Sequence, residues 1–67
     1  MDSRELKAAR VKRGMSQQNV AARIGASTAS YANKENGKTN MSVKEANEIA
    51  RSLGLSSEEI MAIFFGR

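Results

Sequence analysis

The side chains that most often carry acid–base, nucleophilic or metal chemistry are scarce in this chain. Its 67 residues include no histidine and no cysteine, so neither an imidazole base nor a thiolate nor a Cys/His metal site can form. The remaining candidates are scattered carboxylates and lysines without the pairing expected of a catalytic site. We therefore expect a protein that is not an enzyme and that needs no metal or cofactor.

Charge is distributed unevenly along the chain. The formal net charge is +4, made up of about +6 through Lys44 and about −2 beyond it. A basic surface suits an anionic partner such as the phosphate backbone of DNA, and the acidic carboxyl-terminal part is expected to face away from it. Lysine and arginine also solvate ordinary helical surfaces, so charge alone leaves the partner open.

Five helices are expected to position the polar side chains, and each begins at an Asp or Ser that can cap it. The fourth and fifth begin with capping boxes, Ser42 with Glu45 and Ser56 with Glu59. No alternation typical of strands and no domain boundary is visible, so an all-α bundle forming one domain over residues 1–67 is predicted. With their caps, the first helix is expected from Asp2 or Ser3 to residue 14, and the others at 16–25, 27–37, 42–54 and 56–65.

The second and third of these helices are short, and a turn of about three residues that includes Gly25 joins them. Two helices joined in this way cross at a steep angle, which is the geometry of a helix-turn-helix. Any small helical bundle contains tight helix pairs, however, so this spacing alone leaves a purely structural role open.

The chain resembles the phage repressor and Cro family, also called the xenobiotic-response-element family, over nearly its whole length. The resemblance rests on a Ser-Gln helix start, an apolar-Ala pair, a Gly-x-Ser turn and a Glu-Asn-Gly helix end. Here these occur as Ser16-Gln17-Gln18-Asn19-Val20-Ala21-Ala22-Arg23-Ile24-Gly25-Ala26-Ser27 and Glu35-Asn36-Gly37-Lys38. The resemblance implies a five-helix bundle of the lambda-repressor-like type, with helices two and three as the helix-turn-helix.

The same resemblance implies function: a small transcriptional regulator, most simply a repressor, that binds double-stranded DNA sequence-specifically. It also implies a core, and the chain departs from the family pattern at Lys34, usually apolar, and at Tyr31, which brings a hydroxyl to a core position. Tyr31 is expected either to pack in the core alone or to place its hydroxyl at the DNA backbone. The expected core residues are Leu6, Ala9, Met15, Val20, Ile24, Tyr31, Val43, Ala46, Ile49, Leu53 and Leu55.

The recognition helix, residues 28–36, is expected to lie in the major groove. Asn33 can pair with adenine, and the methyl groups of Thr28 and Ala29 can meet a thymine methyl, which favours an A/T-containing half-site. Short side chains that are merely tolerated on an exposed face are the alternative. The residues expected to contact bases are Ser27, Thr28, Ala29 and Asn33.

Phosphate contacts are expected from helix starts, where free N–H groups and the helix dipole attract anions, and from the loop after the recognition helix. Ser16 also fits an ordinary N-cap, Gln17 a solvated position, and Lys38 a cation at a helix C-terminus. The residues expected to contact phosphates are Arg10, Ser16, Gln17, Ser30, Asn36, Lys38 and Asn40.

Arg10 occupies an inward position of the first helix, where a charge is costly without a partner. Glu35 is the only acid in the middle of the chain. The family resemblance implies that the two form an ion pair that links the first helix to the recognition helix. Two separately solvated surface charges are the alternative.

The carboxyl-terminal helix is too apolar to be buried entirely in so small a protein. We expect Ile60, Phe64 and Phe65 to form a homodimer interface, so that a twofold pair reads two half-sites about 34 Å apart. Closure of the core by the phenylalanines is the alternative. A rival function is a protein-partner-binding module of the same fold, such as an antitoxin or the target of an anti-repressor.

The expected location is the cytoplasm. The amino-terminal residues alternate charge and alanine, unlike a signal peptide, and no apolar run approaches the roughly 20 residues that span a membrane. The absence of cysteine is consistent with a reducing compartment. No membrane partner is expected.

Overall fold

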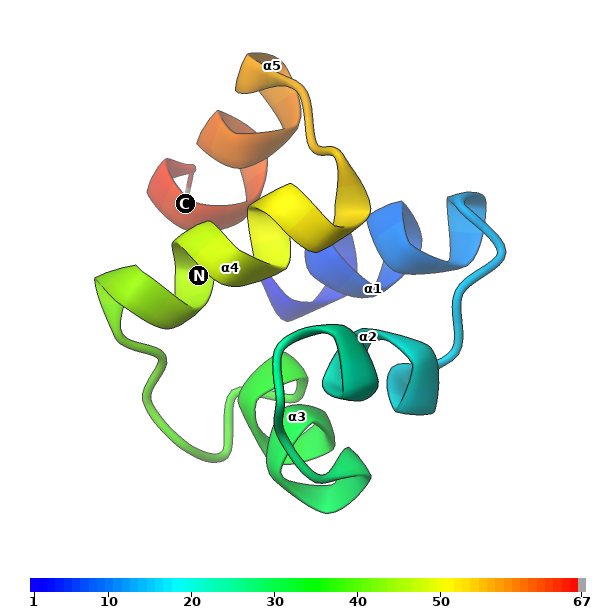
Figure 1. The fold of residues 1–67 in the computed structure, drawn as a ribbon. Coiled ribbons are helices and arrows are strands. Elements are labelled where there is room, and N and C mark those ends of the chain that lie inside the picture. The colour runs from blue at the N-terminus through cyan, green and yellow to red at the C-terminus, as the bar shows by residue number, and fades with distance from the viewer. Residues whose placement is uncertain (67) are drawn as a thin grey trace.

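The computed structural model describes residues 1–66, in which every regular element is a helix and no strand occurs (Figure 1). This confirms the expected all-α fold with five helices. The fifth differs from expectation, because one α-helical turn passes into a wider π-helix. The elements are α1 (Ser3–Lys12), α2 (Gln17–Arg23), α3 (Thr28–Glu35), α4 (Val43–Leu53), α5 (Ser57–Ile60) and η1 (Met61–Phe65).

Each α-helix begins at a cap predicted from the sequence. The side chain of Asp2 accepts hydrogen bonds from two N–H groups of α1, and both expected capping boxes are present. Ser16 forms a further capping box with Asn19, which the sequence pattern did not predict because Asn is less common there than Glu or Gln. Every α-helix therefore has at least one of its first free N–H groups satisfied by the side chain of its N-cap residue, and the helix starts are well defined. The N-cap residues are Asp2, Ser16, Ser27, Ser42 and Ser56.

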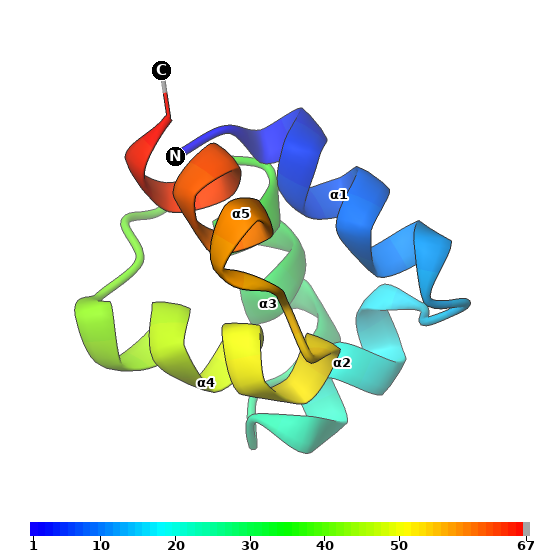
Figure 2. The same cartoon turned by 90° about the horizontal axis from the view of Figure 1, so that it is seen from above.

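The helices enclose one hydrophobic core. Figure 1 shows α5 and η1 at one end of the molecule and α2 and α3 at the other, with α1 and α4 between, and Figure 2 shows α5 nearest the viewer from above. Met15, Ile24 and Leu55, which were expected in the core, lie partly buried against it. The fully packed residues are Leu6, Ala9, Val20, Ala21, Tyr31, Ile49, Leu53 and Ile63.

Val43 departs from the expected core. Its side chain is 79% exposed, although it follows the same helical period as Ile49 and Leu53. Val43 is the first residue of α4, and this end of the helix borders an open groove that Phe64 and Phe65 also line. The expectation that Val43 is a core residue was therefore wrong. Periodicity predicts which face of a helix points inward, but it does not predict how far along the helix other elements cover that face.

Polar contacts fasten the ends of the chain to each other. The Asp2 N–H donates to the carbonyl oxygen of Ile63 at 2.7 Å. Arg13 bonds both carboxylate oxygens of Glu59, the shorter contact being 2.6 Å. The bond from Arg13, together with the Ser56 N–H, lowers the pKa of Glu59 to about 2.

In residues 1–66 no helix is long and apolar enough to cross a membrane.

Candidate nucleic-acid interface

The candidate interface is built on the packing of α2 against α3. They form the most extensive contact between elements of the described residues, with Val20 and Ala21 of α2 buried with Tyr31 of α3. The turn between them contains Gly25 at a φ of +70°, a backbone conformation that side chains with a Cβ rarely adopt. The Ala26 N–H donates to the Ala21 carbonyl at 2.9 Å and closes the turn. The pair therefore has the compact geometry of a helix-turn-helix.

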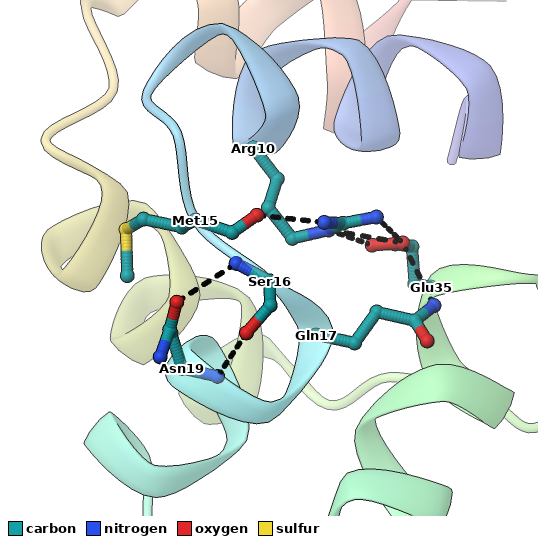
Figure 3. Close-up of polar contacts among 6 residues, drawn as sticks. All are labelled: Arg10, Met15, Ser16, Gln17, Asn19 and Glu35. Carbon is teal, nitrogen blue, oxygen red and sulfur yellow. Dashed lines mark hydrogen bonds and ion pairs between the residues drawn. The ribbon is translucent and has the colours of Figure 1, made fainter.

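A buried ion pair joins α1 to the end of α3. The Nε of Arg10 donates to Glu35 Oε1 at 2.7 Å, and its Nη2 donates to Oε2 at 3.1 Å (Figure 3). Nη1 donates to the Met15 carbonyl oxygen at 2.7 Å. The Glu35 side chain is 1% exposed and that of Arg10 is 9% exposed. The two residues that were expected to meet are thus held together within the protein.

Gln17, the first residue of α2, completes this network. Its Nε2 donates to Glu35 Oε2 at 3.1 Å, and Figure 3 shows the amide oxygen turned away from the carboxylate. Burial by itself raises the pKa of Glu35, but the hydrogen bonds from Arg10 and Gln17 outweigh it, so the pKa lies below its ordinary value. Glu35 is therefore ionised at neutral pH and fixes three segments, α1, the start of α2 and the end of α3.

Most of the residues predicted to contact DNA lie on the surface. Ser30 and Gln17 are half-buried, and Arg10 is buried with all three guanidinium nitrogens bonded within the protein. The hydroxyls of Ser16 and Ser27 accept capping bonds from Asn19 and Ser30, which leaves each O–H free to donate. The predicted residues that are exposed are Ser16, Ser27, Thr28, Ala29, Asn33, Asn36, Lys38 and Asn40.

Comparison with known protein families matches residues 6–60 to a helix-turn-helix family, HTH_3. The chain belongs to this helix-turn-helix family. It is thus a DNA-binding protein of the transcription-regulator class, which is not a class of enzymes. No curated protein and no solved structure matches the chain.

Within this helix-turn-helix protein, Lys34 has a partner that sequence reasoning missed. Its Nζ lies 3.1 Å from Glu45 Oε2, and its side chain is 16% exposed. The pair ties α3 to the first turn of α4, across the loop that carries Asn36, Lys38 and Asn40. The sequence gives no signal for it, because the path of that loop decides which acid Lys34 reaches.

Tyr31 lies wholly in the core, with none of its surface exposed. Its hydroxyl forms no hydrogen bond within 3.5 Å among the described residues, although the Arg10–Glu35 pair lies close enough to affect its pKa. Burial raises the pKa of Tyr31, and the nearby Glu35 carboxylate raises it further. Tyr31 was expected either to pack in the core or to place its hydroxyl at the DNA backbone. It packs in the core, and its hydroxyl does not reach the surface of this helix-turn-helix protein.

Proposed function

We propose that this protein is a transcriptional repressor that binds a double-stranded DNA operator through α2 and α3. The observation that carries the proposal is the network around Glu35, which locks α3 against α1 and α2 while Thr28, Ala29 and Asn33 remain exposed. Rigid placement matters because a recognition helix must enter the major groove at a fixed angle. Residues 28–36 then lie in the groove, with Ser27 at its entrance.

Phosphate contacts fix the register of this helix on the duplex. The exposed Ser16 hydroxyl at the start of α2 and the polar loop with Asn36, Lys38 and Asn40 flank α3 in sequence on both sides. Ser30 and Gln17 each offer part of a half-buried polar side chain, and Gln17 keeps one amide hydrogen free. Arg10 acts mainly by holding Glu35, because one hydrogen on each Nη is all that remains for a phosphate.

A homodimer on two half-sites is part of the proposal. A groove of about 510 Å³ separates the 37–42 loop and α4 from the carboxyl-terminal helix, and Ile60, Phe64 and Phe65 line it. Phe65 and Val43 are 73% and 79% exposed at its rim, which leaves apolar surface for a second copy to cover. A twofold pair would present two recognition helices about 34 Å apart, one turn of DNA.

Sedimentation equilibrium tests the dimer with two matched valine variants. Val43→Ser removes apolar surface beside the groove and is expected to weaken self-association roughly tenfold, because both copies lose it. Val11→Ser changes a valine that is also exposed, on α1 and outside the groove, and should have no effect. A strict monomer at micromolar concentration, or equal effects of the two variants, would contradict this dimer.

The repressor proposal itself is tested by selecting bound sites from random duplex DNA. One sequence should be enriched, and its affinity should exceed that for bulk DNA by about 10³-fold or more and fall steeply as salt rises. Asn33→Ala should relax the preferred sequence, whereas Lys38→Ala should weaken all sites alike. A protein-partner module, antitoxin-like or an anti-repressor target, would give neither enrichment nor a steep salt dependence.

If the selected site overlaps a promoter in the genome of origin, a reporter fused to that promoter decides between repression and activation. Expression should fall when the protein is supplied and recover with Asn33→Ala. Such a role places the protein with the DNA in the cytoplasm. A rise in expression would contradict the repressor assignment while leaving DNA binding intact.

A further inference from the structure

We infer that the recognition helix α3 reads the C5-methyl group of pyrimidines in the major groove, and that it makes no forked contact to guanine. This inference rests on the proposed DNA binding and specifies which chemical group on the DNA is recognised. It is based on the chemical groups that α3 exposes and on the one cation of α3, which is paired within the protein.

The exposed face of α3 combines apolar methyl groups with a few uncharged hydrogen-bonding groups. Thr28, Ala29 and Asn33 are exposed and Ala32 is half-buried, and their spacing puts all four on one face of the helix. Tyr31 and Glu35 are buried on the adjoining face, so Thr28 lies at the edge of the exposed one. The exposed Asn36, which caps α3 one turn beyond Ala32, lies on the same face. The groups presented to a groove are therefore three methyls, one hydroxyl and two amides.

Guanine is most often read by an Arg or Lys that donates to O6 and N7. Residues 28–36 are all described, and the only cation among them is Lys34, whose ammonium is held by Glu45 at 3.1 Å. Lys34 also lies off the Thr28/Ala29 face, beside the buried Tyr31 and Glu35. The recognition helix thus lacks a free cation for guanine.

The methyl groups gather at the amino-terminal end of α3, the end that reaches base edges first in this motif. Thr28 and Ala29 are its first two residues, and Ala32 follows one turn later. A pyrimidine C5-methyl is the only apolar group in the major groove, so it is the natural partner of such a surface. Asn33, one turn beyond Ala29, then offers the amide pair that matches adenine N6 and N7.

Thymine and 5-methylcytosine carry the same methyl at the same place in the groove. The surface formed by Thr28, Ala29 and Ala32 should therefore favour either base over its unmethylated counterpart. Burial of one methyl group corresponds to about fourfold in affinity, so each contacted methyl should contribute a factor of that size.

The test uses the full chain and the duplex most enriched by selection, measured by fluorescence anisotropy at fixed salt. Each thymine is replaced in turn by deoxyuridine, which removes only the methyl. At one or more positions the affinity should fall about fourfold. In a second arm, the same base pair is replaced by C·G and by 5-methyl-C·G, and the methylated duplex should bind about fourfold more tightly than the unmethylated one.

Matched variants of Thr28 assign the effect to α3. Thr28→Ser removes the side-chain methyl but keeps the hydroxyl, and should bring the thymine-to-uracil ratio at one position close to unity without changing affinity for the uracil duplex. Thr28→Val keeps that methyl, and the ratio should stay at about fourfold. Circular dichroism melting confirms that both variants fold.

Three results would overturn the inference. If replacing thymine by uracil has no effect on affinity at any position, the inference is wrong. The proposed function would remain intact, because the duplex would still bind more tightly than bulk DNA. An effect of uracil that is unchanged in Thr28→Ser, Ala29→Ser and Ala32→Ser alike would assign the methyl contact to another segment. Enrichment of no duplex at all would remove the proposed function and the inference together.

Discussion

Removing either partner of the Arg10–Glu35 pair should cost this protein most of its stability. The Glu35 side chain is 1% exposed and that of Arg10 is 9% exposed, so Glu35→Leu or Arg10→Met leaves an uncompensated charge in the interior. Breaking a buried pair in this way costs about 3–5 kcal/mol. A chain of this length is stable by only about 3–10 kcal/mol. Each single variant is therefore expected to lose a large part of its stability, and to be unfolded in water if the wild-type protein lies at the low end of that range.

The double variant Arg10→Met/Glu35→Leu should fold. It replaces both charges with apolar side chains of similar volume, and such replacements are often neutral or stabilising by about 1–4 kcal/mol. Urea titrations followed by circular dichroism at 222 nm give the three free energies of unfolding. With a slope of about 1 kcal/mol/M, each single change should lower the urea midpoint by about 3–5 M, and the second change should restore it.

The pH dependence adds an internal check. In Arg10→Met, burial raises the pKa of the unpaired Glu35, so acid should stabilise this variant by neutralising the carboxylate. The wild-type protein, in which Arg10 and Gln17 hold that pKa below its ordinary value, should lose stability in acid. A loss below about 1 kcal/mol in Glu35→Leu, or a double variant less stable than both singles, would refute this energetic reasoning.

Three further predictions concern the core, the helix ends and the DNA backbone. Tyr31→Phe removes a buried hydroxyl that lacks a partner in residues 1–66 and should raise thermal stability or leave it unchanged; a loss above about 1 kcal/mol would reveal a hydrogen bond to that hydroxyl. The pKa of Glu59 is lowered from 4.5 to about 2, so its contribution is complete above pH 4.5 and lost as the pH falls toward 2. Glu59→Gln should make the acid-induced decline shallower, as seen in melting temperatures across that range, and an unchanged decline would argue against the Arg13 contact. Lys38→Ala should lower affinity for all duplexes and reduce the slope of log affinity against log salt by about 1, whereas a loss confined to one sequence would make Lys38 a base contact.

Local chemistry made much of the fold predictable. Ser and Asp caps satisfy the first free N–H groups of a helix wherever they occur, so the helix starts followed from the sequence and their N-caps agree with it. The Arg10–Glu35 contact was accessible for a related reason. A charge on the inward face of a helix requires a counter-charge, and Glu35 was the one acid in reach.

Features that depend on tertiary geometry were not predictable in this way. Val43 is exposed because the first turn of α4 borders the open groove, and the bond from Gln17 to Glu35 depends on how α2 and α3 pack together. The Lys34–Glu45 pair depends on the course of the 36–42 loop. The passage of α5 into a π-helix depends on packing that places Ile63 in the core and its carbonyl against the Asp2 N–H. None of these has a signature in residue spacing.

The most direct test of the account is to titrate the ¹⁵N-labelled protein with the selected duplex and to follow every backbone amide by NMR. If α2 and α3 form the DNA-binding face, the largest shifts should fall at residues 16–17, 27–33 and 36–40. The exposed residues Glu5, Ala8 and Glu58, which line a shallow groove between α1 and α5, should change little. The largest shifts at that groove, or equally small shifts throughout the chain at saturating DNA, would contradict the account.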